Sequence, residues 1–466
     1  MAITRRQFVT RLGTLAAALG ISQLDLAQVT EAFAHGTTNW NGAWFQKPQL
    51  FWVHGAECTG CSTSLLSLFE DARGTIQGTA ITTLAALDLA VNGTGNGNAV
   101  LNGYPGTGAE ANHPYGHRTM QNTAALTGMN PDGIANNSPY TVNIADVLID
   151  FVELEYHETV MGMGGDLAYK YLDDATGGVH TKPFVMVVEG AVQTKSNVGY
   201  WNSAGTATDA SWCSIGMSGD ANATGAANEA DFADTVFALA GQTNCAAIIA
   251  IGQCASFGGY PAAQSPALKA DARGLAVGAS MTGAQGVYEF LAGQAGDYEN
   301  KVINVPGCPT NPWWFILTVV AWLVDANAAL LGNTPPLGIL LQAGSTALNP
   351  AALDNTQRLK LVYGVSVHGP MCPRYQDFND GNFATVPGEP GCLQYIGCKG
   401  PGTLSLCAVH GWNATNPQND STWENNLGSI KGENGQRPTF CVSAGHPCMA
   451  CTEKGYPDAF VPFVTR

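Results

Sequence analysis

The cysteine spacing between His368 and Cys451 constrains this chain more than any other feature. This stretch holds seven cysteines: Cys372, Cys392, Cys398, Cys407, Cys441, Cys448 and Cys451. Thiolates at this density are typical ligands of soft metal centres, such as zinc or iron–sulfur clusters. A disulfide framework is the alternative, and it is typical of short secreted chains that cannot build a core. With 466 residues, 45% of them hydrophobic, this chain is large enough to build one.

Four more cysteines lie in three short motifs upstream. They are Cys58 and Cys61 in Glu-Cys-Thr-Gly-Cys-Ser, Cys254 in Gly-Gln-Cys-Ala-Ser, and Cys308 in Pro-Gly-Cys-Pro-Thr-Asn-Pro. Each motif follows an apolar run that is typical of a buried strand, at 48–53, 246–251 and 301–305. In open parallel sheets, ligands bind in the loops at the carboxyl ends of the strands. Three such ends would bring the four distant cysteines together.

The alternation of strands and helices predicts an α/β fold with a parallel sheet. A fourth strand is expected at 184–188, and helices are expected after Cys61 and over 154–161. The most apolar run, 313–324, is about a dozen residues long, whereas a membrane span needs about 20. We therefore expect a buried core helix there, and Pro335-Pro336 marks the end of this first domain.

Taken in order, these motifs resemble those of nickel–iron hydrogenase small subunits. The resemblance includes the strings Gly-Cys-x5-Cys-Lys-Gly-Pro at 391–401 and Gly-His-Pro-Cys-x-x-Cys at 445–451. It implies a flavodoxin-like domain over 48–345, with a parallel sheet and a proximal cluster. A smaller, irregular and α-helical iron–sulfur domain over 346–466 would carry the medial and distal clusters.

Three 4Fe–4S clusters need twelve ligands, and the chain offers twelve candidates. They are His368 and all of the thirteen cysteines except Cys213 and Cys245, of which Cys245 begins an apolar run and is most simply a small buried hydrophobe. The resemblance assigns Cys58, Cys61, Cys254 and Cys308 to the proximal cluster; His368, Cys372, Cys392 and Cys398 to the distal cluster; and Cys407, Cys441, Cys448 and Cys451 to the medial cluster.

Some positions depart from family patterns. His368 stands four residues before Cys372, one more than the usual spacing, and an ordinary surface histidine is the alternative. Cys441 stands where most members have a proline and a 3Fe–4S cluster. We therefore expect a medial 4Fe–4S cluster of lower potential, with a buried free thiol as the alternative. Some oxygen-tolerant members have extra cysteines where this chain has Gly60 and Gly259, so an ordinary proximal cluster is expected.

The resemblance also implies a function. The chain would be the electron-transfer subunit of a hydrogenase that interconverts H2 with protons and electrons. The nickel–iron centre belongs to a large subunit, so the chain would be active only with that partner. It would exchange electrons with an external redox partner, for which a cytochrome is one candidate. Glu57 is a candidate for proton transfer, although a capping or solvated carboxylate explains it equally well. A stand-alone electron carrier is the alternative function.

The N-terminus predicts export. Arg5-Arg6 precede an apolar run over 12–21 and an Ala-Phe-Ala site at 32–34, the layout of a twin-arginine signal peptide over 1–34. An amphipathic surface helix with two chance arginines is the alternative. Export would place the protein in the periplasm. No transmembrane helix is expected, because the apolar run is short and no hydrophobic tail follows the last cysteines.

Charge and composition bear on the remaining partners. The chain has 20 Lys and Arg against 36 Asp and Glu, a net charge of −16, which argues against nucleic-acid binding. Two stretches at about 84–139 and 202–228, rich in Gly and Asn, predict surface insertions that the family does not share. They are either passive or contact a partner.

Overall fold

The computed structural model describes most of the region between residues 48 and 465. The described residues are 48–66, 75–76, 79–80, 152–180, 182–194, 213–218, 228–263, 283–326, 340–342, 347–370, 372–412 and 440–465. The predicted signal peptide at 1–34 and the first insertion at 84–139 lie outside them. Most of the second insertion, 202–228, does as well.

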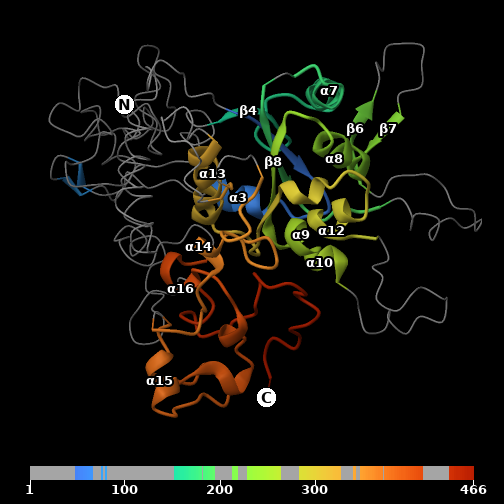
Figure 1. Cartoon of the computed structure of the whole chain (residues 1–466). Coiled ribbons are helices and arrows are strands. Elements are labelled where there is room, and N and C mark those ends of the chain that lie inside the picture. The colour runs from blue at the N-terminus through green and yellow to red at the C-terminus, as the bar shows by residue number, and fades with distance from the viewer. Residues whose placement is uncertain are drawn as a thin grey trace, which may run out of the picture.

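A five-stranded parallel sheet forms the centre of the larger part (Figure 1). The strands are β1 Gln49–His54, β4 Glu153–His157, β5 Phe184–Glu189, β8 Cys245–Ile251 and β9 Val302–Val305. Their order is β4-β1-β5-β8-β9, and every pair is parallel. Counted along the chain, this is the 2-1-3-4-5 order of flavodoxin-like folds. The predicted fold class is confirmed, as are the strands expected at 48–53, 184–188, 246–251 and 301–305.

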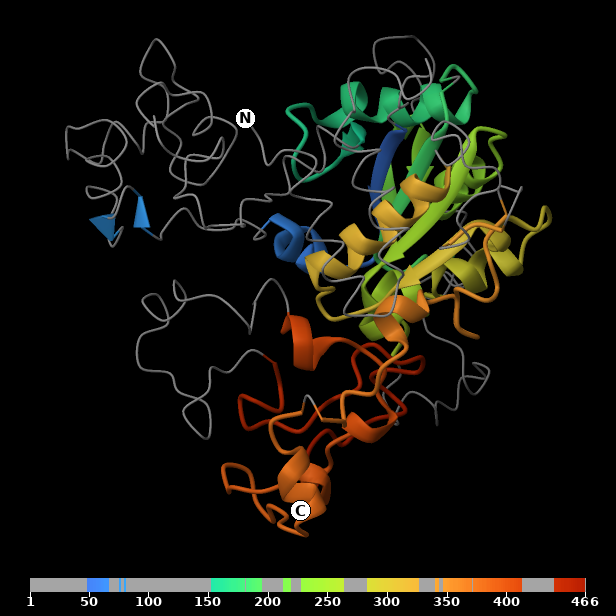
Figure 2. The same cartoon turned by 60° about the vertical axis from the view of Figure 1, so that its left-hand side comes forward.

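Helices cover both faces of the sheet, which explains why its strands are continuous apolar runs (Figure 2). On one face, Trp52 and Val187 share a core with Phe315 of α13 Pro312–Ala326. On the other face, Phe51 and Met186 pack with helices α7, α8 and α12. The helices of this part are α3 Gly60–Leu66, α7 Gly165–Thr176, α8 Phe232–Ala240, α9 Gly252–Phe257, α10 Gly259–Ala262, α12 Val287–Ala292 and α13, with a 3-10 turn at Tyr298–Lys301.

The helix expected at 154–161 was a wrong prediction. These residues form the edge strand β4, which pairs with β1 and ends in a turn. The register shifts between Leu50 and Phe51, so that Leu50 faces Leu154 while Phe51 faces Tyr156. This bulge moves Leu154 and Tyr156 onto opposite faces of the sheet, although they are two residues apart. The period-2 pattern that would have indicated a strand is therefore interrupted.

Two small antiparallel pairs lie outside the main sheet. They are β2 Thr75–Ile76 with β3 Thr79–Ala80, and β6 Ser214–Ser218 with β7 Asn228–Asp231. Strand β6 lies within the second predicted insertion, so that part of the insertion is a strand and not a loop.

The C-terminal part packs below the carboxyl ends of the sheet strands (Figures 1 and 2). It consists of turns and short helices: α14 Lys360–Tyr363, α15 Tyr375–Asn379, α16 Cys407–His410, and 3-10 turns at Leu393–Ile396 and Gly400–Gly402. One core cluster runs from Trp314 of α13 through Tyr363 to Leu393 and Phe440. The two parts therefore share a core. Among the described residues, no helix has both the length and the apolar character needed to cross a bilayer.

Candidate metal centres

The predicted proximal ligands gather where three parallel strands end. Cys58 and Cys61 lie between β1 and the first turn of α3, Cys254 lies in α9 after β8, and Cys308 follows β9. Burial raises the pKa of Cys254 to about 12, and the neighbouring thiols Cys308 and Cys58 add to this. Burial, Glu189 and Cys254 raise the pKa of Cys61. These four thiols are therefore electrostatic neighbours, next to the switch point between β1 and β5.

Three glycines lie against the sulfurs of these cysteines. A Cβ on Gly252 would lie 2.5 Å from the Cys61 sulfur. A Cβ on Gly60 would lie 2.9 Å from the Cys58 sulfur, and one on Gly259 would lie 2.9 Å from the Cys254 sulfur. Real Cβ atoms do not come this close. Neither Gly60 nor Gly259 could therefore become the extra cysteine of the oxygen-tolerant pattern without local rearrangement.

Glu189 at the end of β5 holds the loop between β1 and α3. Its carboxylate is buried and accepts hydrogen bonds from the Cys61 N–H at 2.9 Å, the Ser62 N–H at 3.0 Å and Trp52 Nε1 at 3.1 Å. The Ser62 hydroxyl donates a further bond to it at 2.5 Å. Sequence reasoning missed this residue. Its position at a strand end was the only signal, because a single buried glutamate has no motif.

Glu57, the predicted proton-transfer residue, belongs to a hydrogen-bonded group of acids and histidines. Its carboxylate lies 3.1 Å from His54 Nδ1 and accepts the Thr59 hydroxyl at 3.1 Å. Burial lowers the pKa of His54, but the bond to Glu57 and the charges of Glu189, Glu158 and Glu57 raise it above its ordinary value. Burial and His54 lower the pKa of His157 to about 3. The group can hold a proton near Glu57.

The spacing of donor atoms distinguishes a cluster from a single metal ion. Within the described residues, only His54, Glu57 and Glu189 form a set of three or more potential ligands whose donor atoms lie within 4.8 Å of one another. Glu189 already accepts several donors, so this set is better described as a hydrogen-bonded group. A tetrahedral zinc with Zn–S bonds of about 2.3 Å holds its sulfurs roughly 4 Å apart. No three cysteines are that close.

All thirteen cysteines lie in the described residues, and each is a free thiol. This finding excludes the disulfide framework for this structure. The sulfur sets are too open for one shared zinc ion, and a multi-iron cluster fits them better. Cys245 is buried at the start of β8 in the apolar core, as predicted, and burial raises its pKa to about 12. Cys213 packs against the same core.

The predicted distal ligands surround one turn-rich segment. Burial raises the pKa of Cys372 to about 11, and Cys398 and Cys392 contribute, while the Arg374 N–H opposes them. A Cβ on Gly400 would lie 3.4 Å from the Cys398 sulfur and 3.6 Å from the His368 Cβ. His368 therefore lies beside Cys398. The Cys372 N–H donates to the Gly369 carbonyl at 2.8 Å, a turn that accommodates the extra residue after His368.

The predicted medial ligands are four thiols that are electrostatic neighbours. Burial raises the pKa of Cys407 to about 12, with a contribution from Cys441. Burial and the thiols Cys407, Cys441 and Cys448 all raise the pKa of Cys451. Cys441 therefore lies with the other three, in a largely buried set. The Ser405 hydroxyl donates to the Cys407 sulfur at 3.0 Å.

Close contacts join the three sets into a row. The backbone of Cys308, a proximal candidate, lies close enough to the Cys451 thiol of the medial set to lower its pKa. The Cys448 N–H of the medial set donates to the Cys398 sulfur of the distal set at 3.3 Å. Trp412 Nε1 also donates to the Cys308 carbonyl at 3.2 Å, just after helix α16. The medial set therefore lies between the other two.

Two family models match the chain. They are the 20 kDa subunit of NADH ubiquinone oxidoreductase, over residues 138–322, and the C-terminal region of NiFe/NiFeSe hydrogenase small subunits, over 363–424. The periplasmic NiFeSe hydrogenase small subunit of Desulfomicrobium baculatum is 26% identical, with 99% of each chain covered. The periplasmic NiFe hydrogenase small subunit 1 of Nitratidesulfovibrio vulgaris is 24% identical, over 99% of this chain and 93% of that one.

Solved structures share the fold. The recombinant NiFeSe hydrogenase from Desulfovibrio vulgaris Hildenborough aligns with a TM-score of 0.53 at 23% identity, covering 92% of this chain and 100% of that one. The H2-activated NiFeSe hydrogenase of Desulfomicrobium baculatum aligns with a TM-score of 0.52 at 24% identity, covering 90% of this chain and 98% of that one. At this identity, the alignment supports the architecture alone.

Proposed function

Because the chain belongs to the nickel–iron hydrogenase small subunits, we propose that its three ligand sets relay electrons between the large subunit and an external redox partner. Small subunits of this family carry iron–sulfur clusters, and the large subunit holds the nickel–iron site. The chain is thus part of a hydrogenase and is active together with a large subunit. The contacts that link the proximal, medial and distal sets carry this proposal.

The ligands are assigned to three clusters in the order proximal, medial and distal. Cys58, Cys61, Cys254 and Cys308 would hold the proximal cluster; Cys407, Cys441, Cys448 and Cys451 the medial one; and His368, Cys372, Cys392 and Cys398 the distal one. Bound 4Fe–4S clusters would supply one-electron redox chemistry at these places. The chain's own residues set the spacing and the environment. A neutral imidazole in place of a thiolate at His368 favours a higher distal potential.

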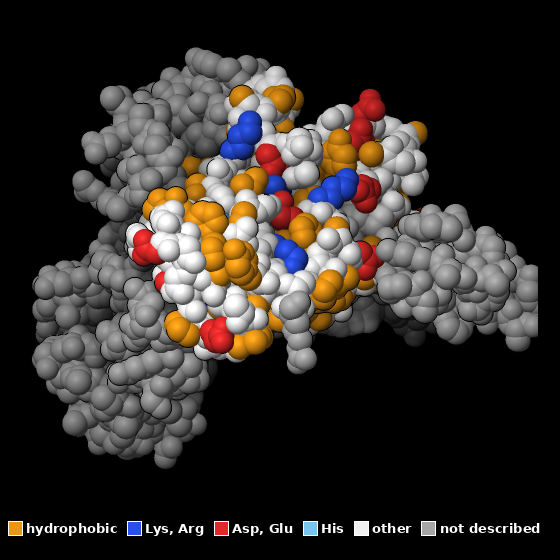
Figure 3. Space-filling model, turned by 90° about the horizontal axis from the view of Figure 1, so that it is seen from below, with side chains coloured by type: hydrophobic (Ala, Val, Ile, Leu, Met, Phe, Trp, Pro, Cys, Tyr) orange, Lys and Arg blue, Asp and Glu red, His pale blue; other side chains and the backbone are white. Residues whose placement is uncertain are grey.

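The exposed Cys58 and the group around Glu57 mark the end that the large subunit would cover. Glu57 would pass protons between its histidine neighbour and that subunit. The C-terminal part presents the other end. Figure 3 shows this face, where apolar side chains gather in patches between scattered charged ones. In the C-terminal part, Tyr395 is 63% exposed and stacks on Phe383 with ring centroids 4.1 Å apart, between the predicted distal ligands Cys392 and Cys398 in the chain. An external redox partner, such as a cytochrome, would dock near it.

The relatives named as periplasmic support the same location for this chain, with export by the twin-arginine pathway through Arg5-Arg6. The two proposed domains, 48–345 and 346–466, would be exported together as one folded unit, because they share one hydrophobic core.

Purification from a native host under anaerobic conditions tests the function. We expect the tagged chain to retain a nickel-containing large subunit, about twelve iron atoms per chain, and H2-driven reduction of a viologen dye. A stand-alone carrier would instead be isolated with its iron but without nickel or a partner, and would not respond to H2. That outcome would replace the hydrogenase function with the alternative.

A further inference from the structure

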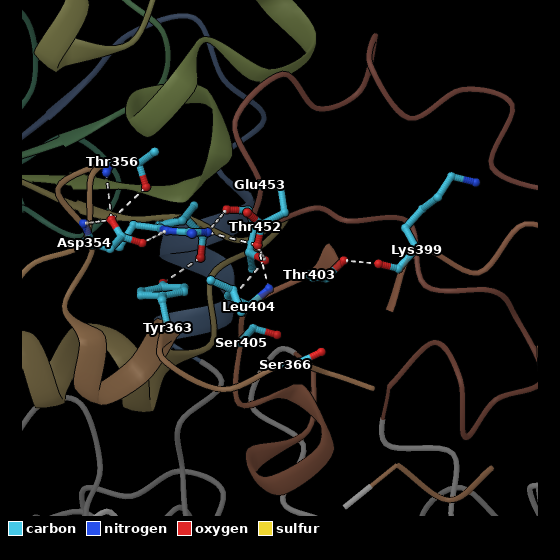
Figure 4. A network of polar contacts seen from close by, with 12 residues as sticks. Asp354, Thr356, Tyr363, Ser366, Lys399, Thr403, Leu404, Ser405, Thr452 and Glu453 are labelled. Carbon is cyan, nitrogen blue, oxygen red and sulfur yellow. Dashed lines mark hydrogen bonds and ion pairs between the residues drawn. The ribbon is translucent and has the colours of Figure 1, made fainter. Parts of the chain in front are cut away.

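A buried ion-pair network lies where the medial segment meets the sheet (Figure 4). Its centre is Arg358, which is 3% exposed. Arg358 Nε donates to Asp354 Oδ2 at 2.8 Å, and Arg358 Nη1 donates to Glu453 Oε1 at 3.0 Å. The guanidinium carbon also lies 5.3 Å from the centre of the Tyr363 ring. A charge this deeply buried is retained only when it is paired and hydrogen-bonded, as it is here.

On one side, the network is attached to the strand that leads to the proximal set. Asn304 of β9 forms a parallel bridge with Arg358, and its N–H donates to the Gln357 carbonyl at 2.8 Å. The Tyr363 hydroxyl donates to the Pro306 carbonyl at 2.8 Å, two residues before Cys308. Arg358 therefore extends the edge of the sheet next to the proximal ligand loop.

On the other side, the network holds the residues that follow the medial ligand Cys451. Arg358 Nη1 donates to the Thr452 carbonyl at 2.9 Å. The Leu404 N–H, three residues before Cys407, donates to Glu453 Oε1 at 2.6 Å. From the proximal side, Gln253 Nε2 donates to the Glu453 carbonyl at 2.9 Å. The segment after Cys451 is thus fixed by residues beside both proximal and medial ligands.

We propose that Arg358 is a positioning residue for electron transfer. It fixes the Cys451–Glu453 segment against β9, and its buried charge offsets the Asp354 and Glu453 carboxylates and so keeps the reduction potential of the medial cluster higher than it would be without Arg358. This inference rests on the proposed function. A nearby cation stabilises the reduced cluster, which carries one more negative charge, and a water-poor site screens that attraction weakly.

The position of Tyr363 indicates that the charge of Arg358 can act on the medial sulfurs. Burial raises the pKa of Tyr363, the Arg358 charge opposes the shift, and the thiols Cys407, Cys451 and Cys61 add to it. The ring over which the guanidinium lies is therefore within electrostatic reach of medial and proximal sulfurs. Arg358 is not itself a ligand or a neighbour of a ligand in the chain.

The test uses the assembled holoenzyme with three single variants. Arg358→Met removes the charge and keeps the unbranched apolar stem of the side chain, while Arg358→Lys keeps the charge and loses the planar fork. The matched control is Lys454→Met, which removes a positive charge one residue after Glu453. Lys454 is 58% exposed and pairs with Glu289 at the surface, where water and salt screen it.

The readout is the midpoint of the medial cluster in a redox titration followed by electron paramagnetic resonance, together with iron content. We expect Arg358→Met to shift the medial reduction equilibrium about tenfold toward the oxidised form, which is about 59 mV for one electron. Arg358→Lys should retain most of the potential, and Lys454→Met should leave it unchanged. A wild-type potential in an Arg358→Met protein with all its iron would overturn the inference.

Arg358→Met removes one partner of a buried ion pair and could prevent folding. Glu453→Gln covers that case, because it keeps the shape and the acceptor oxygen and removes a negative charge from the same network. It should shift the medial equilibrium toward the reduced form, and an unchanged potential would also overturn the inference. Absence of clusters or of the large subunit in the wild type would instead refute the proposed function.

Discussion

At the residue scale, Cys441 decides the chemistry of the medial set. A proline in its place would leave three thiols, whereas here burial and the nearby Cys398 raise the pKa of a fourth thiol that lies beside Cys407 and Cys451. Four thiols can hold four irons, and three leave one iron site without a protein ligand. The backbone also fixes this loop, since the His446 N–H donates to the Cys441 carbonyl at 2.8 Å.

Cys441→Pro should therefore convert the medial cluster to the 3Fe–4S type. The oxidised 3Fe–4S form is paramagnetic and the oxidised 4Fe–4S form is silent, so the variant should gain a resonance signal of about one spin per chain. Cys213→Ser is the control, because Cys213 packs against a core cluster that contains none of the twelve candidate ligands. A full 3Fe–4S signal in undamaged wild-type protein would contradict the assignment.

Residue type and spacing indicated candidate ligands, but not the residues that support them. The cysteines and His368 could be proposed as ligands because their type and spacing are typical of metal ligation. Glu189 and Arg358 could not, because their roles depend on burial and on partners more than ninety residues away in the chain. A single charged residue in a sequence carries no sign that it will be buried.

At the element scale, short elements that follow strands carry the predicted proximal ligands. Helix α9 begins at Gly252, which has a φ of +85° and faces the Cys61 sulfur. The positive φ and the proximity of the sulfur both exclude a residue with a side chain at this position. The sequence has a glycine before Gln-Cys, but the requirement for glycine is visible only when β1 and β8 lie in one sheet and bring Cys61 next to Gly252.

Gly252→Ala should therefore lose proximal iron and destabilise the protein by about 1–3 kcal/mol, because the residue must adopt a strained φ and its Cβ collides with a ligand. Iron analysis and the midpoint of thermal unfolding measure both effects. Gly402→Ala is the matched control, since a Cβ there meets no atom within 4 Å. Full iron content in Gly252→Ala would show that the loop adapts.

The turn from Asp354 to Arg358 gives a pH-dependent contribution to stability. The Asp354 carboxylate accepts the Thr356 and Arg358 N–H groups at 2.8 and 3.0 Å. Burial tends to raise its pKa, but these bonds and the Arg358 charge lower it overall. A carboxyl with a lowered folded-state pKa stabilises the fold above its unfolded value of about 4, and this contribution is lost as the pH falls through the folded-state value.

Asp354→Asn should lower the midpoint of thermal unfolding at pH 7, by an amount equivalent to about 1–3 kcal/mol. The difference from wild type should narrow as the pH falls below about 4, because the wild-type carboxyl is then protonated as well. Glu389→Gln, at an exposed turn, serves as the comparison. A difference that stays constant down to low pH would show that the charge of Asp354 contributes nothing.

The edge strand β4 shows why element prediction was incomplete. Core strands of a parallel sheet are buried on both faces and appear as apolar runs, so β1, β5, β8 and β9 were predicted correctly. In β4, the bulge opposite Leu50 and Phe51 changes which side chains face each core. A bulge is set by pairing with another strand, and the segment's own pattern does not reveal it.

At the scale of the whole molecule, the fold class and the parallel sheet could be predicted from the motifs. The contact between the parts could not. Hydrogen bonds join the medial segments to the proximal loops. Trp412, which follows the medial candidate Cys407, donates to the Cys308 carbonyl, and Gln253, next to the proximal candidate Cys254, donates to the Glu453 carbonyl. These bonds join residues about one hundred and two hundred positions apart, and no local pattern encodes them.

These contacts between the two parts favour export of the protein after folding, which is what a twin-arginine signal directs. Replacing Arg5 and Arg6 by Lys should leave the precursor, with its clusters, inside the cell. Cell fractionation followed by immunoblotting measures this. Delivery of the Lys-Lys variant to the periplasm at the wild-type level would contradict the signal peptide assignment at 1–34.

The burial of the medial set has a consequence for the rate of the proposed electron relay. Cys407, Cys448 and Cys451 are each at most 9% exposed. Their partners include Ser405, whose hydroxyl is held by contacts within the fold. When charge arrives in such a place, few water molecules have to reorient around it. The reorganisation energy should therefore be smallest in the middle of the row and larger toward Cys58 and Tyr395, where solvent or a partner protein completes the surroundings.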